Sequence, residues 1–166
     1  MAEKPAFPSQ SSSLQWKRLL VPIDFSAPSE AALIYTFKLT HLTGAEAHAC
    51  HIIPIPHVLD ALYERGFTPA ETVKRITQEA RRRIKAIAQA QGVTTPVRIH
   101  VKEGDASVAI LEQAAALKAD LIVMGTHGRR GARRFFLGSV AETIIRRASC
   151  PVLTLRATPP DTHSHR

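Results

Sequence analysis

Hydrophobic positions along the chain fall into five short segments that alternate with four longer segments of helical spacing. The short segments predict strands at residues 19–23, 47–53, 97–101, 121–124 and 151–155; at 97–101 apolar residues alternate with polar ones, and the others are mainly apolar runs. The longer segments repeat apolar residues every three or four positions and predict helices at about 27–43, 69–91, 106–117 and 139–147. Strands that alternate with helices are typical of a parallel sheet covered on both faces, so the predicted fold class is α/β.

The ends of the first predicted helix are marked by residues with known positional preferences. Ser26 is placed to cap its N-terminus, Pro28 lies in its first turn, and Gly44 is placed to end it. The helical spacing predicts a buried stripe on this helix. Its expected members are Ala32, Tyr35, Leu39 and Leu42.

The other predicted helices also carry start signals. Thr68 to Glu71 has the form of a capping box with proline at the first helical position, and Asp105 is placed to cap the third helix. Ser139 to Glu142 repeats the capping-box pattern at the start of the fourth helix. Residues 81–83 are three consecutive arginines, which we interpret as a solvated face of the second helix.

A glycine-containing loop follows the fourth predicted strand. The apolar run 121–124 stops at Gly125, further glycines lie at Gly128, Gly131 and Gly138, and Gly138-Ser139 opens an amphipathic segment. Glycine lets backbone N–H groups approach a ligand closely, and a helix N-terminus offers unpaired N–H donors with a partial positive charge. This combination predicts an anion site that takes phosphate, and therefore a nucleotide. A P-loop is excluded because the loop has no lysine, and the spacing GxGxxG is absent.

Length and composition indicate one soluble domain with a tail at each end. The chain has 166 residues, 45% of them hydrophobic, and no apolar run approaches the roughly 18 residues that span a membrane. Residues 1–15 are rich in proline and serine and are expected to be a disordered tail rather than a secretory signal, and the polar residues 157–166 a flexible one. Two cysteines suit reduced thiols, which favours a cytoplasmic protein.

The strongly basic balance suggests acidic partners. The net charge is +8 at pH 7, which leaves nucleic acid open as a partner. However, the arginines are spread over helices and only 5% of residues are aromatic, so no stacking platform for single strands is visible and nucleic acid is disfavoured. No carboxylate or His/Cys group has the spacing of metal ligands. A divalent ion, Mg²⁺ or Mn²⁺, is expected only with the phosphates of a bound nucleotide.

The glycine spacing is specific enough to indicate a family. Gly125, Gly128, Gly138 and Ser139 stand as Gly-x2-Gly-x9-Gly-Ser, preceded by Met124 and followed by residues 148–156, ASCPVLTLR. This pattern resembles the nucleotide-binding signature of the universal stress protein family, and the similarity covers residues 16–156. The resemblance implies an open, doubly wound sheet with strand order 3-2-1-4-5. It also implies a homodimer that pairs through the last strand, Pro151–Leu155.

The resemblance also implies which residues contact a nucleotide. In nucleotide-binding members an aspartate after the first strand contacts adenine, which corresponds here to Asp24 within residues 21–26, VPIDFS. An apolar residue at the end of the second strand packs on the base, and Met124 would close the base pocket. Gly125 and Gly128 would line the ribose and phosphates. The full expected set is Pro22, Ile23, Asp24, Ser26, Ile52, Met124, Gly125, Gly128, Gly138, Ser139 and Val140.

Simpler roles remain open for several of these residues. Asp24 is also placed to cap the following helix, and Ser139 is placed as an N-cap, which is compatible with phosphate contact. His127 is either a phosphate ligand or catalytic acid, or a solvated or locally bonded side chain. The four arginines of residues 129–134 either steer phosphate electrostatically or form a solvated basic loop.

The expected function is that of an ATP-binding stress-response protein without committed catalysis. The sequence holds no HxGH, no GxSxG and no paired carboxylates near the glycine loop. A slow ATP hydrolase or a phosphotransfer enzyme on the same fold is the alternative.

Overall fold

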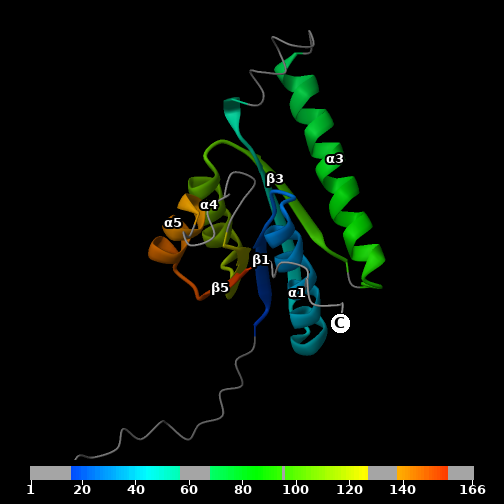
Figure 1. Cartoon of the computed structure of the whole chain (residues 1–166), viewed down its shortest axis with the longest axis vertical. Helices are drawn as coiled ribbons and strands as arrows, with labels where there is room; N and C mark the ends of the chain where they lie inside the picture. The colour runs from blue at the N-terminus through cyan, green and yellow to red at the C-terminus, as the bar shows by residue number, and fades with distance from the viewer. Residues whose placement is uncertain (1–15, 57–67, 95, 127–137, 157–166) are drawn as a thin grey trace, which may run out of the picture.

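A computed structural model describes residues 16–56, 68–94, 96–126 and 138–156 of the chain. Five parallel strands form one sheet with the order β3-β2-β1-β4-β5, which confirms the expected topology (Figure 1). The strands are β1 (Arg18–Pro22), β2 (Glu46–Ile53), β3 (Arg98–Glu103), β4 (Leu121–Gly125) and β5 (Val152–Leu155). Each lies within one or two residues of its predicted position, because apolar runs mark the buried strands and alternation marks the edge strand β3.

Helices cover both faces of the sheet, as the alternation of elements predicts. They are α1 (Ala27–Thr43), α3 (Pro69–Ala90), α4 (Ala106–Leu117) and α5 (Ser139–Arg147). Helices α1 and α3 lie on one face and α4 and α5 on the other (Figure 1). We call these the α1 face and the α4 face.

Alternation along the strands divides the core between the two faces. Leu19 and Val21 of β1 pack with Leu33 of α1 on the α1 face. Leu20 packs on the opposite face with Ile122 of β4 and Ile144 of α5. All six side chains are fully buried. The central part of the sheet is therefore covered by helices on both surfaces, which suits a parallel sheet.

The predicted buried stripe of α1 is correct for Ala32, which is fully buried, and for Leu39, which packs against the core of the α1 face, and wrong for Tyr35 and Leu42. Tyr35 is 40% exposed and Leu42 is 78% exposed, while Leu33, Thr36 and Phe37 are buried. The helix has apolar residues on several sides, so spacing alone does not select the buried face. Burial of Thr36 is tolerated because its hydroxyl donates to the Ala32 carbonyl, which leaves no polar atom unpaired.

Of the four predicted N-cap residues, Ser26, Thr68 and Asp105 are confirmed and Ser139 is wrong. Thr68 and Glu71 form the reciprocal capping box of α3, and the Asp105 carboxylate accepts from the Val108 N–H at the start of α4. At α5 the N-cap is Gly138, so Ser139 is already the first helical residue and forms no capping box. The physical reason is that the Gly138 N–H donates to the Thr126 carbonyl, which ties Gly138 to the end of β4.

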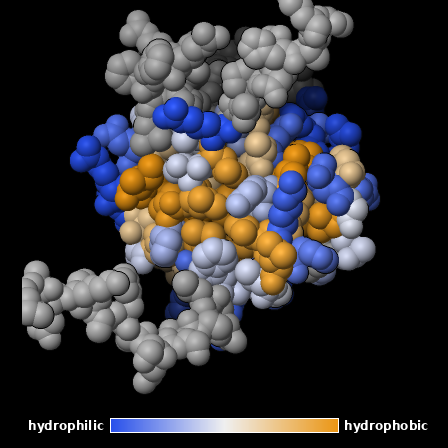
Figure 2. Space-filling model, turned by 60° about the horizontal axis from the view of Figure 1, so that its bottom comes forward, coloured by the Kyte–Doolittle hydropathy of each residue, from blue (hydrophilic) through white to orange (hydrophobic). Residues whose placement is uncertain are grey.

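A groove of about 460 Å³ lies between the C-terminal ends of α1 and α3. Ile34, Phe37, Leu42 and Val93 supply most of its apolar lining. Figure 2 looks toward this end of the molecule and shows hydrophobic surface across it. Both helices run antiparallel to the strands, so this groove is at the N-terminal edge of the sheet. None of the helices that the structure describes has the length and hydrophobicity to cross a membrane.

Candidate functional site

The candidate site lies where the strand order reverses, between β1 and β4. Strand β1 pairs with β2 on one side and with β4 on the other, so the connections after β1 and β4 leave toward opposite faces. In open α/β sheets, ligands bind in the crevice beyond the strand C-termini at such a reversal. Asp24 follows β1, Gly125 ends β4, and Gly138 begins α5, so the structure brings the three key predicted elements to this edge.

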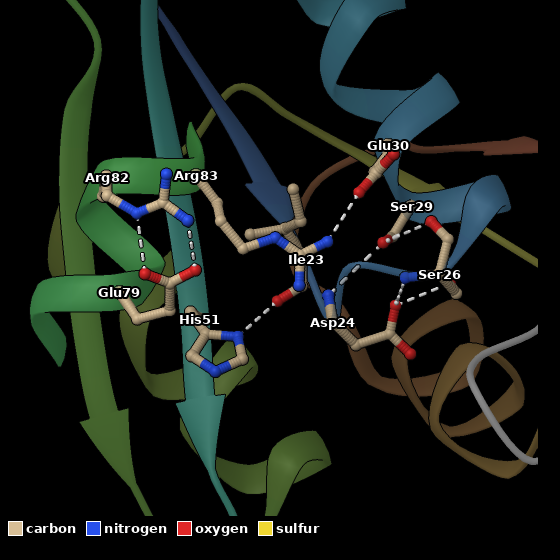
Figure 3. Close-up of polar contacts among 9 residues, drawn as sticks. All are labelled: Ile23, Asp24, Ser26, Ser29, Glu30, His51, Glu79, Arg82 and Arg83. Carbon is tan, nitrogen blue, oxygen red and sulfur yellow. Dashed lines mark hydrogen bonds and ion pairs between the residues drawn. The ribbon is translucent and has the colours of Figure 1, made fainter. Parts of the chain in front are cut away.

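Asp24 is built into a tight turn between β1 and α1. Its Oδ1 atom accepts from the Ser26 N–H at 3.0 Å and from the Ser26 hydroxyl at 2.6 Å (Figure 3). Ser26 is the N-cap residue of α1, but its side chain makes no capping bond, because its hydroxyl is directed to Asp24. Asp24 therefore does not take the capping position that the sequence left open for it; its carboxylate instead holds the turn before the helix, and contact with a base stays a prediction.

Ser29 closes the same turn from within α1. Its hydroxyl donates to the Ser26 carbonyl at 3.0 Å and accepts from the Asp24 N–H at 3.3 Å (Figure 3). Ser29 is buried, so water does not compete strongly for these bonds. The turn that carries the Asp24 carboxylate is thus held at both ends by side-chain hydrogen bonds.

A second layer of side chains supports this turn, and sequence analysis missed it. The His51 Nδ1–H donates to the Ile23 carbonyl at 2.7 Å, which assigns the proton to Nδ1 because a carbonyl can only accept. The Phe25 ring lies 5.0 Å from the His51 ring, and Arg83 of α3 lies over the same Phe25 ring at 4.1 Å. The signal available was a histidine next to Ile52 and Ile53 at the C-terminal end of β2.

The end of β4 approaches α1 closely. A Cβ atom added at Gly125 would lie 2.7 Å from the Pro28 Cβ and 2.8 Å from the Pro28 carbonyl carbon. Gly125 is therefore required by helix–strand packing, whatever it does for a ligand. This packing holds the first turn of α1 against β4 and so places the Asp24 turn beside the β4 end.

The N-terminus of α5 faces the same edge of the sheet. The Gly138 N–H donates to the Thr126 carbonyl at 2.9 Å, and the first helical bond of α5 runs from the Glu142 N–H to the Gly138 carbonyl. The N–H groups of a first helical turn have no acceptor inside their own helix, and the helix dipole gives them a partial positive charge. Ser139 is exposed and Val140 is half-buried, so this turn is open to an anion.

The apolar residues predicted for the base pocket lie together in the core of the α4 face. Ile52 is 9% exposed and Met124 is 5% exposed, and both belong to one cluster with Ala141 of α5. Val140 packs against this cluster at its border. Pro22 and Ile23 are also buried, at the end of β1. Met124 is thus a core residue of the α4 face, and its predicted role in closing a base pocket stays a prediction.

Part of the predicted site lies outside the described residues. Gly128, His127 and the basic residues 129–134 belong to this part. Among the residues that the structure does describe, no cluster of three histidine, cysteine or acidic side chains is arranged to hold a metal ion. A divalent ion held by nucleotide phosphates stays a prediction.

Comparisons with known proteins agree with the fold and with the sequence pattern. The model of the universal stress protein family matches residues 15–156. Universal stress protein MJ0531 of Methanocaldococcus jannaschii is 35% identical over 144 residues, covering 85% of this chain and 82% of that protein. A universal stress protein of Thermus aquaticus is 36% identical over 144 residues, covering 85% of this chain and 99% of that protein.

Solved structures share the same architecture. The structure of protein MJ0577, also from M. jannaschii, matches with a TM-score of 0.73 at 26% identity, over 87% of this chain and 99% of that one. A universal stress protein in complex with cAMP matches with a TM-score of 0.61 at 22% identity, over 87% of this chain and 99% of that one. At 22% identity, the likeness to the cAMP complex shows the fold alone.

Proposed function

The chain belongs to the universal stress protein family, and we propose that it is a cytoplasmic stress-response protein that binds ATP without committed catalysis. The observation that carries the proposal is the meeting of the Asp24 turn and the α5 N-terminus at the β1/β4 reversal. A solved structure with the same fold is a complex with cAMP, which supports an adenine nucleotide as the class of ligand.

The two halves of the site suit the two ends of a nucleotide. A carboxylate at a strand C-terminus can accept from the exocyclic amine of adenine, which guanine does not present at the same position. The first turn of α5 offers backbone donors and a positive dipole end to phosphate. Mg²⁺ or Mn²⁺ would enter with the phosphates and neutralise part of their charge. The net charge of +8 favours the approach of such an anion.

We test the base half of the site with two variants at one position. Asp24→Ala removes the carboxylate and also the hydrogen bonds that close the turn. Asp24→Asn keeps an acceptor for the Ser26 N–H but presents an amide N–H₂ where a carboxylate oxygen stood. Both variants should weaken ATP binding and reduce its preference over GTP in calorimetry. If Asp24→Asn keeps the wild-type preference, Asp24 serves only the turn.

We test the phosphate half with Gly138→Val. The Gly138 backbone has φ −63° and ψ 147°, which valine adopts readily, so loss of binding would come from the branched Cβ beside the phosphate position. Loss of one charge-assisted hydrogen bond costs about 1.5–3 kcal/mol, or roughly tenfold or more in affinity. Thr68→Val is the matched control, because it weakens the N-cap of α3 and leaves α5 unchanged. Unchanged ATP affinity in Gly138→Val would overturn the nucleotide proposal.

Two measurements address the competing functions. Incubation of the protein with ATP and a divalent ion, followed by analysis of the nucleotide, distinguishes a binder from a slow hydrolase or phosphotransfer enzyme. DNA affinity measured at two salt concentrations tests the nucleic-acid alternative, which predicts a steep salt dependence. Mass spectrometry of a nucleotide that copurifies would identify the ligand directly.

A homodimer through β5 belongs to the same proposal. Among the strands that the structure describes, β5 pairs only with β4, so its outer edge offers unpaired backbone groups. Leu153 and Leu155 are half-buried, packed partly on the core of the α1 face. An apolar edge of this kind favours pairing with a second copy across a two-fold axis.

A further inference from the structure

Arg83 connects the second layer of the Asp24 turn to two helices. Its guanidinium carbon lies 4.1 Å from the centre of the Phe25 ring, which is the geometry of a cation–π contact. Its Nη2 atom also donates to the Glu30 carboxylate at 3.0 Å (Figure 3). Arg83 thus joins α3, the loop after β1 and the first turn of α1.

The Phe25 backbone needs such support. Its φ is +63°, in the left-handed region that is disfavoured for residues with a Cβ atom. Such conformations persist where the surroundings hold them, and they cluster at functional sites. Phe25 stands between Asp24 and Ser26, so a change of its backbone conformation would redirect the Asp24 carboxylate and break its bonds to Ser26.

His51 holds the same loop from the sheet. Its ring contacts the Phe25 ring with centroids 5.0 Å apart and planes tilted by 46°. Its Nδ1–H fixes the Ile23 carbonyl, at the residue just before Asp24. His51 is buried and lies on β2, a central strand, so it is a rigid anchor. Contacts from β2 and from α3 therefore converge on one side chain of the loop.

From this arrangement we propose that Arg83 and Phe25 are positioning residues that hold the Asp24 turn in the conformation that recognises a base. The inference rests on the proposed function, because it assigns to these residues the selectivity of that site. Neither residue needs to touch the nucleotide. The clamp, defined as Arg83, Phe25 and His51, acts by stabilising the left-handed backbone of Phe25.

The neighbouring arginine provides a matched control. Arg82 lies on the same helix and carries the same charge, and it donates two hydrogen bonds at 2.7 Å to Glu79, one turn away on α3 (Figure 3). Substituting Arg82 or Arg83 by glutamine removes one charge and one ion pair in each case. The two variants differ because Arg83 contacts the Phe25 ring and pairs with Glu30 on α1, whereas the ion pair of Arg82 lies within α3.

The experiment compares Arg83→Gln, Arg83→Lys and Arg82→Gln in the full chain. Amide exchange of Ser26, read by NMR without ligand, should rise at least fivefold in Arg83→Gln and stay within twofold of wild type in Arg82→Gln. Calorimetry should show ATP affinity lowered about three- to tenfold in Arg83→Gln, with the preference for ATP over GTP lowered in parallel. Lysine keeps the charge but loses the planar group, so Arg83→Lys should lie between wild type and Arg83→Gln.

Each outcome decides a separate point. Unchanged Ser26 exchange in Arg83→Gln overturns the clamp. Faster exchange with an unchanged ATP-to-GTP ratio overturns its role in recognition. If the wild-type protein binds no adenine nucleotide, the proposed function fails and the recognition role fails with it, whereas the exchange comparison still establishes or refutes the clamp itself.

Discussion

Replacement of Gly125 by alanine is the sharpest test of how the site is assembled. The added Cβ would lie 2.7 Å from the Pro28 Cβ, 2.8 Å from the Pro28 carbonyl carbon and 3.0 Å from the Pro28 oxygen. Apolar carbon atoms prefer separations of about 3.5–4.0 Å. About 1 Å of overlap must therefore be relieved by moving the first turn of α1 away from β4.

The cost follows from what must move. Overpacking a filled interior costs about 1–3 kcal/mol, and the upper end applies because two of the three overlapping atoms belong to the Pro28 backbone. For a domain of this size 1 kcal/mol corresponds to roughly 2–4 °C in Tm. The expected decrease in Tm is therefore about 6–12 °C. The shift also moves Ser26 and with it the Asp24 turn, so ATP affinity should fall in the folded variant.

Thermal unfolding followed by circular dichroism measures this effect. Gly104→Ala is the control, because a Cβ there meets no heavy atom within 4 Å although its φ of +128° strains an alanine. The comparison separates a packing overlap, in Gly125→Ala, from backbone strain, in Gly104→Ala. Only Gly125→Ala should lose affinity for ATP. If Gly125→Ala melts within about 2 °C of wild type, the close approach of α1 to β4 is refuted.

Three further results are expected. Leu153→Lys places a charge on the proposed dimer strand and should shift the protein toward monomer in sedimentation; a wild-type protein that is already monomeric would contradict the interface. Burial lowers the pKa of both His48 and His100, so as the pH falls the unfolded chain takes up protons before the folded protein does. The free energy of unfolding should therefore decrease as the pH falls below 6.5. A series of urea titrations between about pH 5 and 8 that shows no such decrease would contradict this. Burial also raises the pKa of the Cys50 thiol to about 11, so a thiol reagent should modify the half-buried Cys150 first in the native protein. Rapid labelling of Cys50 in a Cys150→Ser variant would contradict the burial of Cys50.

Short-range sequence signals predicted the elements and most of their ends. Apolar runs located the interior strands because a buried parallel strand leaves both of its faces in the core, whereas the edge strand β3 was located by the alternation of Val97, Ile99 and Val101. Thr68 and Asp105 located helix starts correctly, since a cap needs only the backbone N–H groups two or three residues later. The strand order came from the resemblance to a family, because periodicity does not determine which strands are neighbours.

Long-range contacts decided the points where sequence reasoning failed or was silent. The buried face of α1 depends on where the helix lies across the sheet, and hydroxyls that bond back to their own helix allow that face to include Thr36. The start of α5 depends on a bond from Gly138 to Thr126, twelve residues earlier in the chain. Local capping preference is worth about 1 kcal/mol, and tertiary contacts of this kind readily override it.

The candidate site shows the same division. The sequence alone determined that an aspartate follows the first strand and that glycines follow the fourth, and it thereby predicted the nucleotide edge of the sheet. Only the tertiary structure decided that Gly125 must be glycine to admit Pro28, and that Arg83 reaches Phe25 from another helix. The physical reason is that a close approach or a ring contact joins residues far apart in the chain, and neither leaves a periodic pattern near the residues that make it.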